Sequence, residues 1–341
     1  MTAPSAAPDP SRPARPSVEF ARTPDGWDLA LHHYRGTPPA PALPPVILCP
    51  GYACNHVFLD FNERYSLARF LARRGFDTWA LDLRGHGDSE PAGARRPDWS
   101  FDDLVQLDLP TAVRAVRTLS GRRPVWIGHS MGGILMYAAL GTDTGLQESI
   151  AGLVTLASPV AFPPVASPLL RGLGQLLVTL PVPQHLPQRG ALVALWSALS
   201  WAPGTLDVGM NPVNVDVDAF GQALRRCISN VPRSVLRQLA DWSLSGELRS
   251  ADRRIDYRAN LSHISTPALI IAGTVDRLAA PAIVRVAYDR ISSTEKQYRE
   301  FGIVDGDSAD YGHVDLIFGR HAPDEVFPVI AAWIASVPEG R

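Results

Sequence analysis

The chain has 341 residues, 46% of them hydrophobic, and can therefore bury a core of substantial size. It carries 32 basic and 34 acidic side chains, and the formal charge of -2 argues against nucleic acid as a partner. The chain has three cysteines, Cys49, Cys54 and Cys227. This odd number is a poor basis for a disulfide framework and fits a reducing compartment, so we expect a cytoplasmic protein.

Residues 1–17 are rich in proline and alanine and lack the continuous apolar segment of a secretory signal, so we expect a disordered leader. The most apolar later stretch, residues 169–182, is interrupted by Arg171 and Pro181 and is shorter than the roughly 20 residues that span a bilayer. We therefore expect no stable insertion into a membrane.

Strands and helices alternate after the leader. Two segments with alternating polarity flank Pro24-Asp25-Gly26 within residues 18–36, which predicts an antiparallel hairpin at a sheet edge. Short apolar runs predict parallel strands buried on both faces, at residues 46–49, 78–81, 125–127, 153–156 and 268–271. Helix-like stretches occupy residues 65–74, 101–119 and 132–140, and a last unit pairs a strand at 296–301 with a helix at 323–335. This alternation predicts an α/β fold with a mostly parallel, doubly wound sheet.

The alternation stops between residues 161 and 264, where helical patterns and prolines occur without a convincing buried strand. A loop of this length is unusual inside a compact domain, so we interpret the segment as an inserted helical cap. The core then comprises residues 18–160 and 265–338.

A Gly-x-Ser-x-Gly pattern follows one of the buried strands and precedes a helix. Gly128 and Gly132 flank Ser130, and both positions need a residue without a side chain because the turn is tight. This setting holds a serine above the sheet in a strained conformation at a helix N-terminus. The pattern therefore predicts that Ser130 is a nucleophile.

A serine nucleophile needs a base and a carboxylate that orients the base, in the chain order Ser, acid, His. Asp276 follows the strand at residues 268–271, at the edge where open α/β sheets place their sites, and is the predicted acid. The alternative role for Asp276 is a helix N-cap, and rival acids crowd the loop before the base at Asp305, Asp307 and Asp310.

His313 is the predicted base, because it lies in a loop between the last strand and the terminal helix. His86 and His129 compete with it. His86 precedes the serine in the chain, and His129 adjoins Ser130 on a turn that should direct the two side chains apart.

Backbone N–H groups should stabilise the oxyanion of the tetrahedral intermediate. Met131, the residue after the nucleophile, should supply one N–H group. Tyr52 should supply the second, because Gly51 lets the loop after the first buried strand approach the site, and Ala53 is the alternative donor.

These motifs resemble the α/β-hydrolase superfamily over residues 18–337. The resemblance rests on Gly-His-Ser-Met-Gly-Gly at 128–133, on Asp-Leu-Arg-Gly-His-Gly-Asp-Ser at 82–89, and on the pairing of Asp276 with His313. It implies a serine hydrolase, and it implies that the motif at 82–89 is structural. Ser130 departs from the aspartate nucleophile of the family's haloalkane dehalogenases and epoxide hydrolases.

Two further stretches, residues 49–55 and 311–316, resemble the acid-lipase and polyhydroxyalkanoate-synthase side of the superfamily. Pro50-Gly51 replaces the His-Gly with which most relatives begin the oxyanion loop. Ser130 replaces the cysteine nucleophile of the polymer synthases, which favours hydrolysis or ordinary acyl transfer.

The predicted cap is rich in leucine and tryptophan, which suggests either an apolar acyl pocket or a cap that packs on itself. The residues concerned are Leu169, Leu170, Leu173, Leu176, Leu177, Val178, Leu180, Leu192, Leu195, Trp196, Leu199 and Trp201. The leading hypothesis is hydrolysis of a lipophilic carboxylic ester. Acyl transfer or cyclisation with an alcohol or amine acceptor, and ligand binding on a hydrolase scaffold, are the alternatives.

No organic cofactor is expected, because the chain supplies nucleophile, base and donors itself. No metal is expected either, since neither histidines nor a second cysteine pair accompany Cys49 and Cys54 at zinc-like spacing. The sequence leaves the oligomeric state open.

Overall fold

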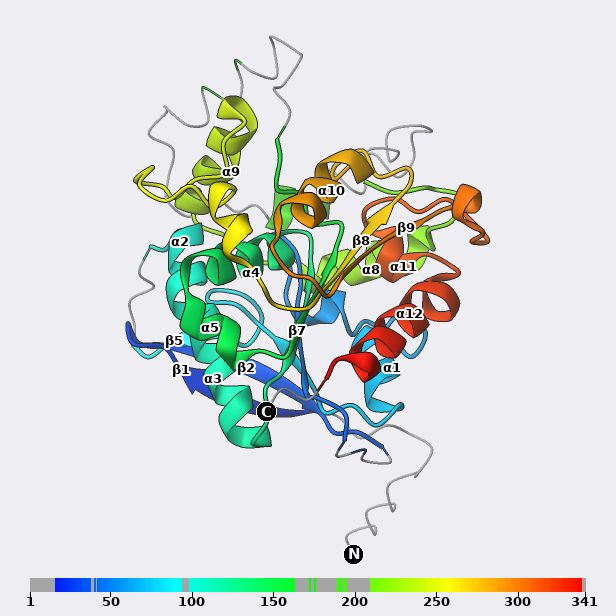
Figure 1. Cartoon of the computed structure of the whole chain (residues 1–341), viewed down its shortest axis with the longest axis horizontal. Helices are drawn as coiled ribbons and strands as arrows, with labels where there is room; N and C mark the ends of the chain where they lie inside the picture. Colours follow the sequence, from blue (N-terminus) through cyan, green and yellow to red (C-terminus); the bar gives the residue numbers. More distant parts are fainter. Residues whose placement is uncertain are drawn as a thin grey trace, which may run out of the picture.

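A computed structural model describes residues 16–37, 40, 42–93, 98–162, 172, 175, 189–191, 193–194 and 209–338. A central sheet is covered on both faces by helices (Figure 1). Helices α1 (Leu67–Ala72) and α12 (Ala322–Ser336) lie on one face, and α3 (Leu109–Ser120), α4 (Met131–Thr142) and α5 (Thr144–Ser149) lie on the other. This layering confirms the predicted α/β architecture.

The described residues form a sheet of nine strands, in which neighbouring strands follow the order β1-β2-β4-β3-β6-β7-β8-β9, with β5 paired to β2. The pairings of β2 with β1, β4 and β5 are antiparallel, and all other pairings are parallel. The strand bounds are β1 (Ser17–Arg22), β2 (Trp27–Tyr34), β3 (Val46–Cys49), β4 (Thr78–Leu81), β5 (Glu90–Pro91), β6 (Val125–His129), β7 (Gly152–Leu156), β8 (Ala268–Gly273) and β9 (Lys296–Phe301).

The strand predictions agree closely with the structure because their physical cause is local. Strands β3, β4, β6, β7 and β8 are buried at every residue, as expected for strands covered on both faces. The hairpin of β1 and β2 turns at Gly26, whose φ of +89° favours glycine. β1 pairs with β2 alone and forms the predicted edge of the sheet.

Capping residues set the helix boundaries. The side chain of Ser66 accepts a hydrogen bond from Arg69 N, so α1 begins at Leu67 rather than at residue 65. The predicted helix at 101–119 is a continuous helical segment, in which α2 (Phe101–Asp103) passes through a π-helical stretch, η2 (Leu104–Asp108), into α3. Gly121, with a φ of +72°, ends α3.

Helical elements also occupy the described part of the segment between β7 and β8. These are α8 (Val217–Cys227), α9 (Arg233–Ser245) and the 3-10 turn η3 (Ala259–His263). The leucine and tryptophan residues named above for the cap lie outside the described residues, and the cap boundaries stay a prediction. Among the described helices, none combines the length and the apolar character needed to cross a bilayer.

The remaining elements follow β8 or lie in loops near it. They are α10 (Pro281–Arg290), α11 (Asp315–Phe318), η1 (His56–Phe58) and η4 (Ile303–Asp305). In the sheet, β3 lies between β4, the next strand in the chain, and β6, which follows later. Such a reversal of strand order opens a crevice at the carboxyl ends of the strands, where α/β sheets bind ligands.

Candidate active site

Ser130 occupies the tight turn between β6 and α4. Its φ of +51° and ψ of -119° lie outside the regions that residues with a side chain prefer. A Cβ atom at Gly128 would lie 2.4 Å from the carbonyl carbon of Gly132, and one at Gly132 would lie 2.4 Å from Cys49 O. The two glycines thus allow the strand, the helix and the loop after β3 to meet at Ser130.

Two hydrogen bonds, both made by His313, join the three residues predicted as nucleophile, base and acid. Oγ of Ser130 is 2.9 Å from Nε2 of His313, and Nδ1 of His313 is 2.8 Å from Oδ2 of Asp276. Because an ionised carboxylate only accepts hydrogen bonds, His313 carries its proton on Nδ1 and leaves Nε2 to accept from the serine hydroxyl. The residues come from three segments that are far apart in the chain.

The carboxylate of Asp276 is fixed on both sides. While Oδ2 faces His313, Oδ1 accepts hydrogen bonds from the backbone N–H groups of Leu278 and Ala279, each at 2.8 Å. Its side chain is fully buried. These bonds leave little freedom for the carboxylate to rotate away from His313.

The rival acids have other partners. Asp307 forms an ion pair of 2.6 Å with Arg299, and Asp305 lies 4.0 Å from the same guanidinium group. Asp310 accepts a hydrogen bond of 3.1 Å from the hydroxyl of Thr274. The structure therefore brings Asp276, and none of these three, to the imidazole of His313.

The rival histidines also lie elsewhere. Burial lowers the pKa of His86, whose Nδ1 is 2.9 Å from the carbonyl oxygen of Arg84. His129 directs its ring away from the serine hydroxyl, with Nε2 3.0 Å from the carbonyl oxygen of His313. Burial, with a smaller effect from the charge of His313, lowers the pKa of His129 to about 3. Both rings are therefore neutral near pH 7.

Of the predicted oxyanion donors, Met131 follows Ser130 in the chain, and Tyr52 follows a glycine that approaches Ser130. Met131 is the first residue of α4, where backbone N–H groups have no acceptor within the helix. A Cβ atom at Gly51 would lie 3.1 Å from Cβ of Ser130. The loop after β3 therefore approaches the serine closely at the residue that precedes Tyr52 in the chain. Ala53, the alternative donor, has a φ of +57°, a conformation that is rare for a residue with a side chain. The choice between Tyr52 and Ala53 stays a prediction.

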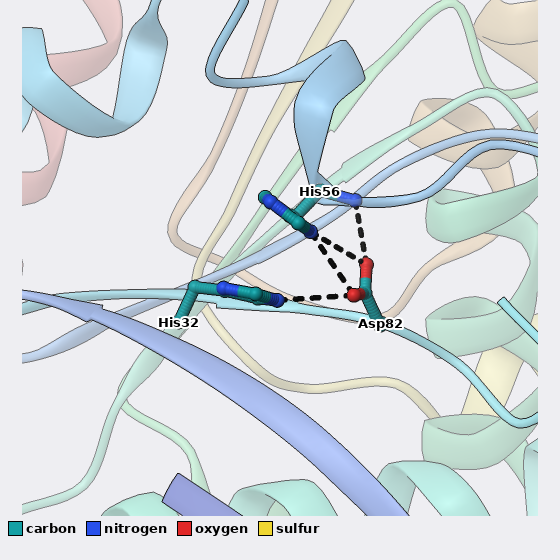
Figure 2. A group of neighbouring side chains, drawn as sticks. All are labelled: His32, His56 and Asp82. Carbon is teal, nitrogen blue, oxygen red and sulfur yellow. Dashed lines mark hydrogen bonds and ion pairs between the residues drawn. The ribbon is translucent and has the colours of Figure 1, made fainter. Parts of the chain in front are cut away.

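A group of His32, His56 and Asp82, of which His56 is partly exposed, fastens this loop to the sheet (Figure 2). Asp82 Oδ2 is 3.0 Å from His32 Nε2 and 3.0 Å from His56 Nδ1, while Oδ1 accepts a 2.7 Å bond from His56 N. Burial alone would raise the pKa of the Asp82 carboxyl, but the hydrogen bonds from both histidines hold it well below its usual range. The three side chains thereby join β2, the loop after β3 and the loop after β4.

The same three residues are a possible metal-binding group, since their ligand atoms lie within 4.8 Å of one another. Two histidines and a carboxylate suit zinc or another transition metal. However, the imidazole rings are stacked with centroids 3.5 Å apart, and each ring directs a nitrogen at the carboxylate itself. Hydrogen bonding accounts for this arrangement without an ion.

A second contact fastens the loop after β3 to α8. The sulfur atoms of Cys54 and Cys227 are 3.9 Å apart, and both residues are buried. Ser229 N donates a 2.7 Å hydrogen bond to Ala53 O, and Asn55 N donates a 2.9 Å bond to Cys227 O. The loop that carries the predicted donor is thus held from both sides.

Comparison with known proteins identifies the family of this chain. The family model described as the alpha/beta hydrolase fold matches residues 44–317. The chain belongs to the α/β-hydrolase family. The match includes Ser130, Asp276 and His313, and the fold class of this α/β hydrolase is the one expected above.

Several proteins resemble this α/β hydrolase over most of their length. Triacylglycerol lipase 1 of Arabidopsis thaliana is 26% identical, with 90% of this chain and 84% of the relative aligned. Lipase member K of Homo sapiens is 23% identical, with 89% and 84% aligned. Among solved structures, an esterase from Exiguobacterium antarcticum superposes with a TM-score of 0.62 at 15% identity, covering 93% of this chain and 99% of the other. This structural likeness supports the fold.

Sequence reasoning missed several residues that surround the site of this α/β hydrolase. His32 falls within the predicted edge hairpin at residues 18–36, where the sequence gives it no role, but its side chain is buried against Asp82. Asp82 opens the motif at 82–89, so its position was visible in the sequence, but its partner His56 carries no comparable pattern. Asp315 lies within the motif around His313, and only the fold shows what it contacts.

Proposed function

We propose that this α/β hydrolase cleaves carboxylic esters through an acyl-enzyme, with Ser130 as nucleophile, His313 as base and Asp276 as the acid that orients the base. The observation that carries the proposal is the pair of hydrogen bonds at Nε2 and Nδ1 of His313, 2.9 Å and 2.8 Å long. An imidazole bound in this way can accept a proton on one side while a carboxylate stabilises the charge on the other.

In the first half of the reaction, Oγ of Ser130 attacks the carbonyl carbon of the ester and its proton moves to Nε2 of His313. The carbonyl oxygen becomes an oxyanion, which the backbone N–H groups of Met131 and Tyr52 stabilise, with Ala53 as the alternative second donor. The intermediate then collapses, the bond to the alcohol breaks, and the alcohol leaves with the proton from Nε2.

In the second half, a water molecule attacks the carbonyl carbon of the acyl-enzyme. His313 accepts a proton from the water and returns a proton to Oγ of Ser130 as the carboxylic acid leaves. Asp276 keeps the same tautomer of His313 through both halves, because its Oδ1 is held by two backbone N–H groups and its Oδ2 faces Nδ1.

The acyl group is lipophilic in this proposal. Support comes from the names of the sequence relatives, among them a triacylglycerol lipase and a lipase. The apolar composition of residues 161–208 adds to it, because ester pockets for long chains are lined mainly by apolar side chains.

Covalent labelling with a fluorophosphonate tests the nucleophile and the base. Attack by Oγ of Ser130 on phosphorus forms a P–O bond and releases fluoride, and peptide mapping should locate the adduct on Ser130. Ser130→Ala should abolish the label and His313→Ala should nearly abolish it. A folded wild-type protein that takes up no label, or a label on another residue, would refute the proposal.

A series of p-nitrophenyl esters of increasing chain length tests the substrate class. We expect kcat/KM to rise from acetate to medium or long acyl chains, and a sharp preference for acetate would contradict a lipophilic pocket. Adding an alcohol to the reaction separates hydrolysis from acyl transfer. Free acid as the main product supports hydrolysis, and a new ester as the main product favours acyl transfer.

A further inference from the structure

Residues 209–216, the strap, run alongside the loop at residues 310–320, the His313 loop. At one end, Val314 N donates a 3.1 Å hydrogen bond to Gly209 O. At the other end, Arg320 N donates a 2.8 Å bond to Asn214 O. The strap leads directly into α8, so it joins the helical segment between β7 and β8 to the loop that carries the predicted base.

The strap touches the His313 loop at the residue before the histidine. A Cβ atom at Gly312 would lie 2.7 Å from Cα of Met210, a separation that no side chain tolerates. The side-chain amide of Asn211 donates a 2.8 Å bond to Asp310 O on the same loop. The backbone on the N-terminal side of His313 therefore rests on the strap.

Asp315 connects the two segments two residues after the histidine. Its side chain is fully buried and accepts hydrogen bonds from Asn211 N at 3.1 Å and from Asn214 Nδ2 at 3.2 Å. It also accepts from the backbone N–H of Gly312. One carboxylate thus binds the strap and the backbone of Gly312, the residue before the histidine.

Amide groups compensate the buried charge of Asp315. Among the described residues, no cation forms an ion pair with it. Burial raises its pKa to about 7, although the bonds from Asn211, Gly312 and Asn214 oppose this shift. Oδ1 of Asn214 is buried with no hydrogen-bond partner in the described part of the chain. Protonation of Asp315 would turn one accepting oxygen into a donor and weaken the bonds that the ionised form makes.

Other titratable groups lie on the strap, on the loop of Asp315 itself and on α12. The strap contributes only Asp216, its last residue, which accepts a 3.3 Å hydrogen bond from the hydroxyl of Tyr65. The His313 loop contributes Asp310, Tyr311, His313 and, at its end, Arg320. The hydroxyl of Tyr311 donates a 2.5 Å bond to Glu325 of α12. The side chains of Asp310 and His313 have other partners. Asp310 is hydrogen-bonded to Thr274, and His313 is hydrogen-bonded to Asp276.

We propose that Asp315 is a positioning residue that holds His313 in line with Ser130 by fastening the His313 loop to the strap. The competent form is the ionised one, because only that form accepts all of these hydrogen bonds. The inference rests on the proposed role of His313 as base.

The test compares Asp315→Asn with Asp108→Asn. Asp108 is another fully buried carboxylate, and it is bonded to Arg84 at 2.7 Å, away from the His313 loop. The rate of fluorophosphonate labelling of Ser130 is measured from pH 5 to 9, with thermal unfolding as a check on folding. Asp315→Asn should slow labelling roughly tenfold, because small displacements of a catalytic group cost this much or more. Asp108→Asn should lower thermal stability without changing the labelling rate of the folded protein.

The pH profile gives a second readout that a purely structural role would not change. In the wild type, the acid limb of the labelling profile should include the protonation of Asp315, and in Asp315→Asn this step should be missing. Asn214→Ala removes a donor that lowers the pKa of Asp315, so the acid limb should move to higher pH. This variant also keeps the inference testable if Asp315→Asn does not fold.

The possible failures are distinct. Labelling of Asp315→Asn at the wild-type rate with an unchanged pH profile would overturn the inference and leave the proposed function standing. An unchanged profile for Asn214→Ala would overturn it in the same way. A wild-type protein that is not labelled would refute the proposed function, and with it the role given to Asp315.

Discussion

Nε2 of His129 lies 3.0 Å from the backbone carbonyl oxygen of His313. A carbonyl oxygen only accepts, so His129 carries its proton on Nε2 and donates to the neighbouring histidine's backbone. The ring also packs against Phe58, with centroids 4.8 Å apart. The residue beside the predicted nucleophile thus supports the predicted base.

His129→Phe should slow labelling of Ser130 without moving the acid limb of the pH profile. The substitution keeps a ring against Phe58 but removes the bond to His313 O, a loss of about 1 kcal/mol in the free energy of unfolding. The pH profile should not change, because His129, with a pKa lowered to about 3, is neutral throughout. His86→Phe serves as the control, since it should affect stability alone. Equal labelling rates for both variants would contradict the role of His129.

Gly132→Ala should destabilise the protein by about 2–3 kcal/mol, as overpacking against rigid atoms does. Its Cβ would lie 2.4 Å from Cys49 O and 2.6 Å from Pro50 O, and these backbone atoms cannot move without displacing the loop after β3. Urea unfolding measures the change. Gly93→Ala is the matched control, because a Cβ there meets nothing within 4 Å and should shift stability by less than about 0.5 kcal/mol. Similar values for the two variants would be inconsistent with the packing described.

Asp276→Asn should lower kcat by roughly 10⁴-fold, the effect that this change has in Ser-His-Asp hydrolases. Oδ1 can keep its bonds to Leu278 and Ala279, which leaves the new NH₂ group facing Nδ1 of His313. His313 would then have to accept at Nδ1 and carry its proton on Nε2, the wrong tautomer for a base. Steady-state ester hydrolysis is the measurement.

Asp305→Asn is the control for this prediction, and its kcat should stay near the wild-type value. Asp305 is a rival acid by sequence, but it lies near Arg299 rather than His313. If Asp305→Asn lowered kcat strongly and Asp276→Asn left it near the wild-type value, the assignment of the acid would be wrong.

His56→Gln should lose more stability at pH 6 than at pH 9. Burial alone would lower the pKa of His56, but the hydrogen bond and charge of Asp82, with smaller contributions from Asp88 and Asp60, raise it. A group with a raised folded-state pKa stabilises the protein fully below its unfolded pKa, about 6.5, and loses this contribution as the pH rises through the folded value. Urea unfolding at the two pH values measures the difference.

The control places His56→Gln in an Asp82→Asn background, where the carboxylate that raises the pKa is gone. There the loss caused by His56→Gln should be nearly equal at pH 6 and pH 9. A pH dependence that survives in this background would show that Asp82 is not its cause. His32, which shares the carboxylate, is present in all the proteins compared.

Most of the strands, and the positions of Ser130, Asp276 and His313 at strand ends, could be predicted from the sequence, because buried strands and tight glycine turns are local patterns. Helix boundaries were less accurate where a cap decides them, as Ser66 does for α1. The contacts of His56, Cys227 and Asp315 could not be predicted. Each depends on a partner from a distant segment, and hydrogen-bond partners leave no periodic pattern in a chain.

The sequence by itself determined the fold class of this protein and the order of its chemical groups, since burial and turn geometry select residue types along the chain. Only the tertiary structure decided which of four carboxylates faces His313, which two histidines bind Asp82, and which segments Asp315 fastens together. These choices depend on distances of about 3 Å between atoms that the sheet and its loops bring together, and such distances depend on the complete packing of the chain.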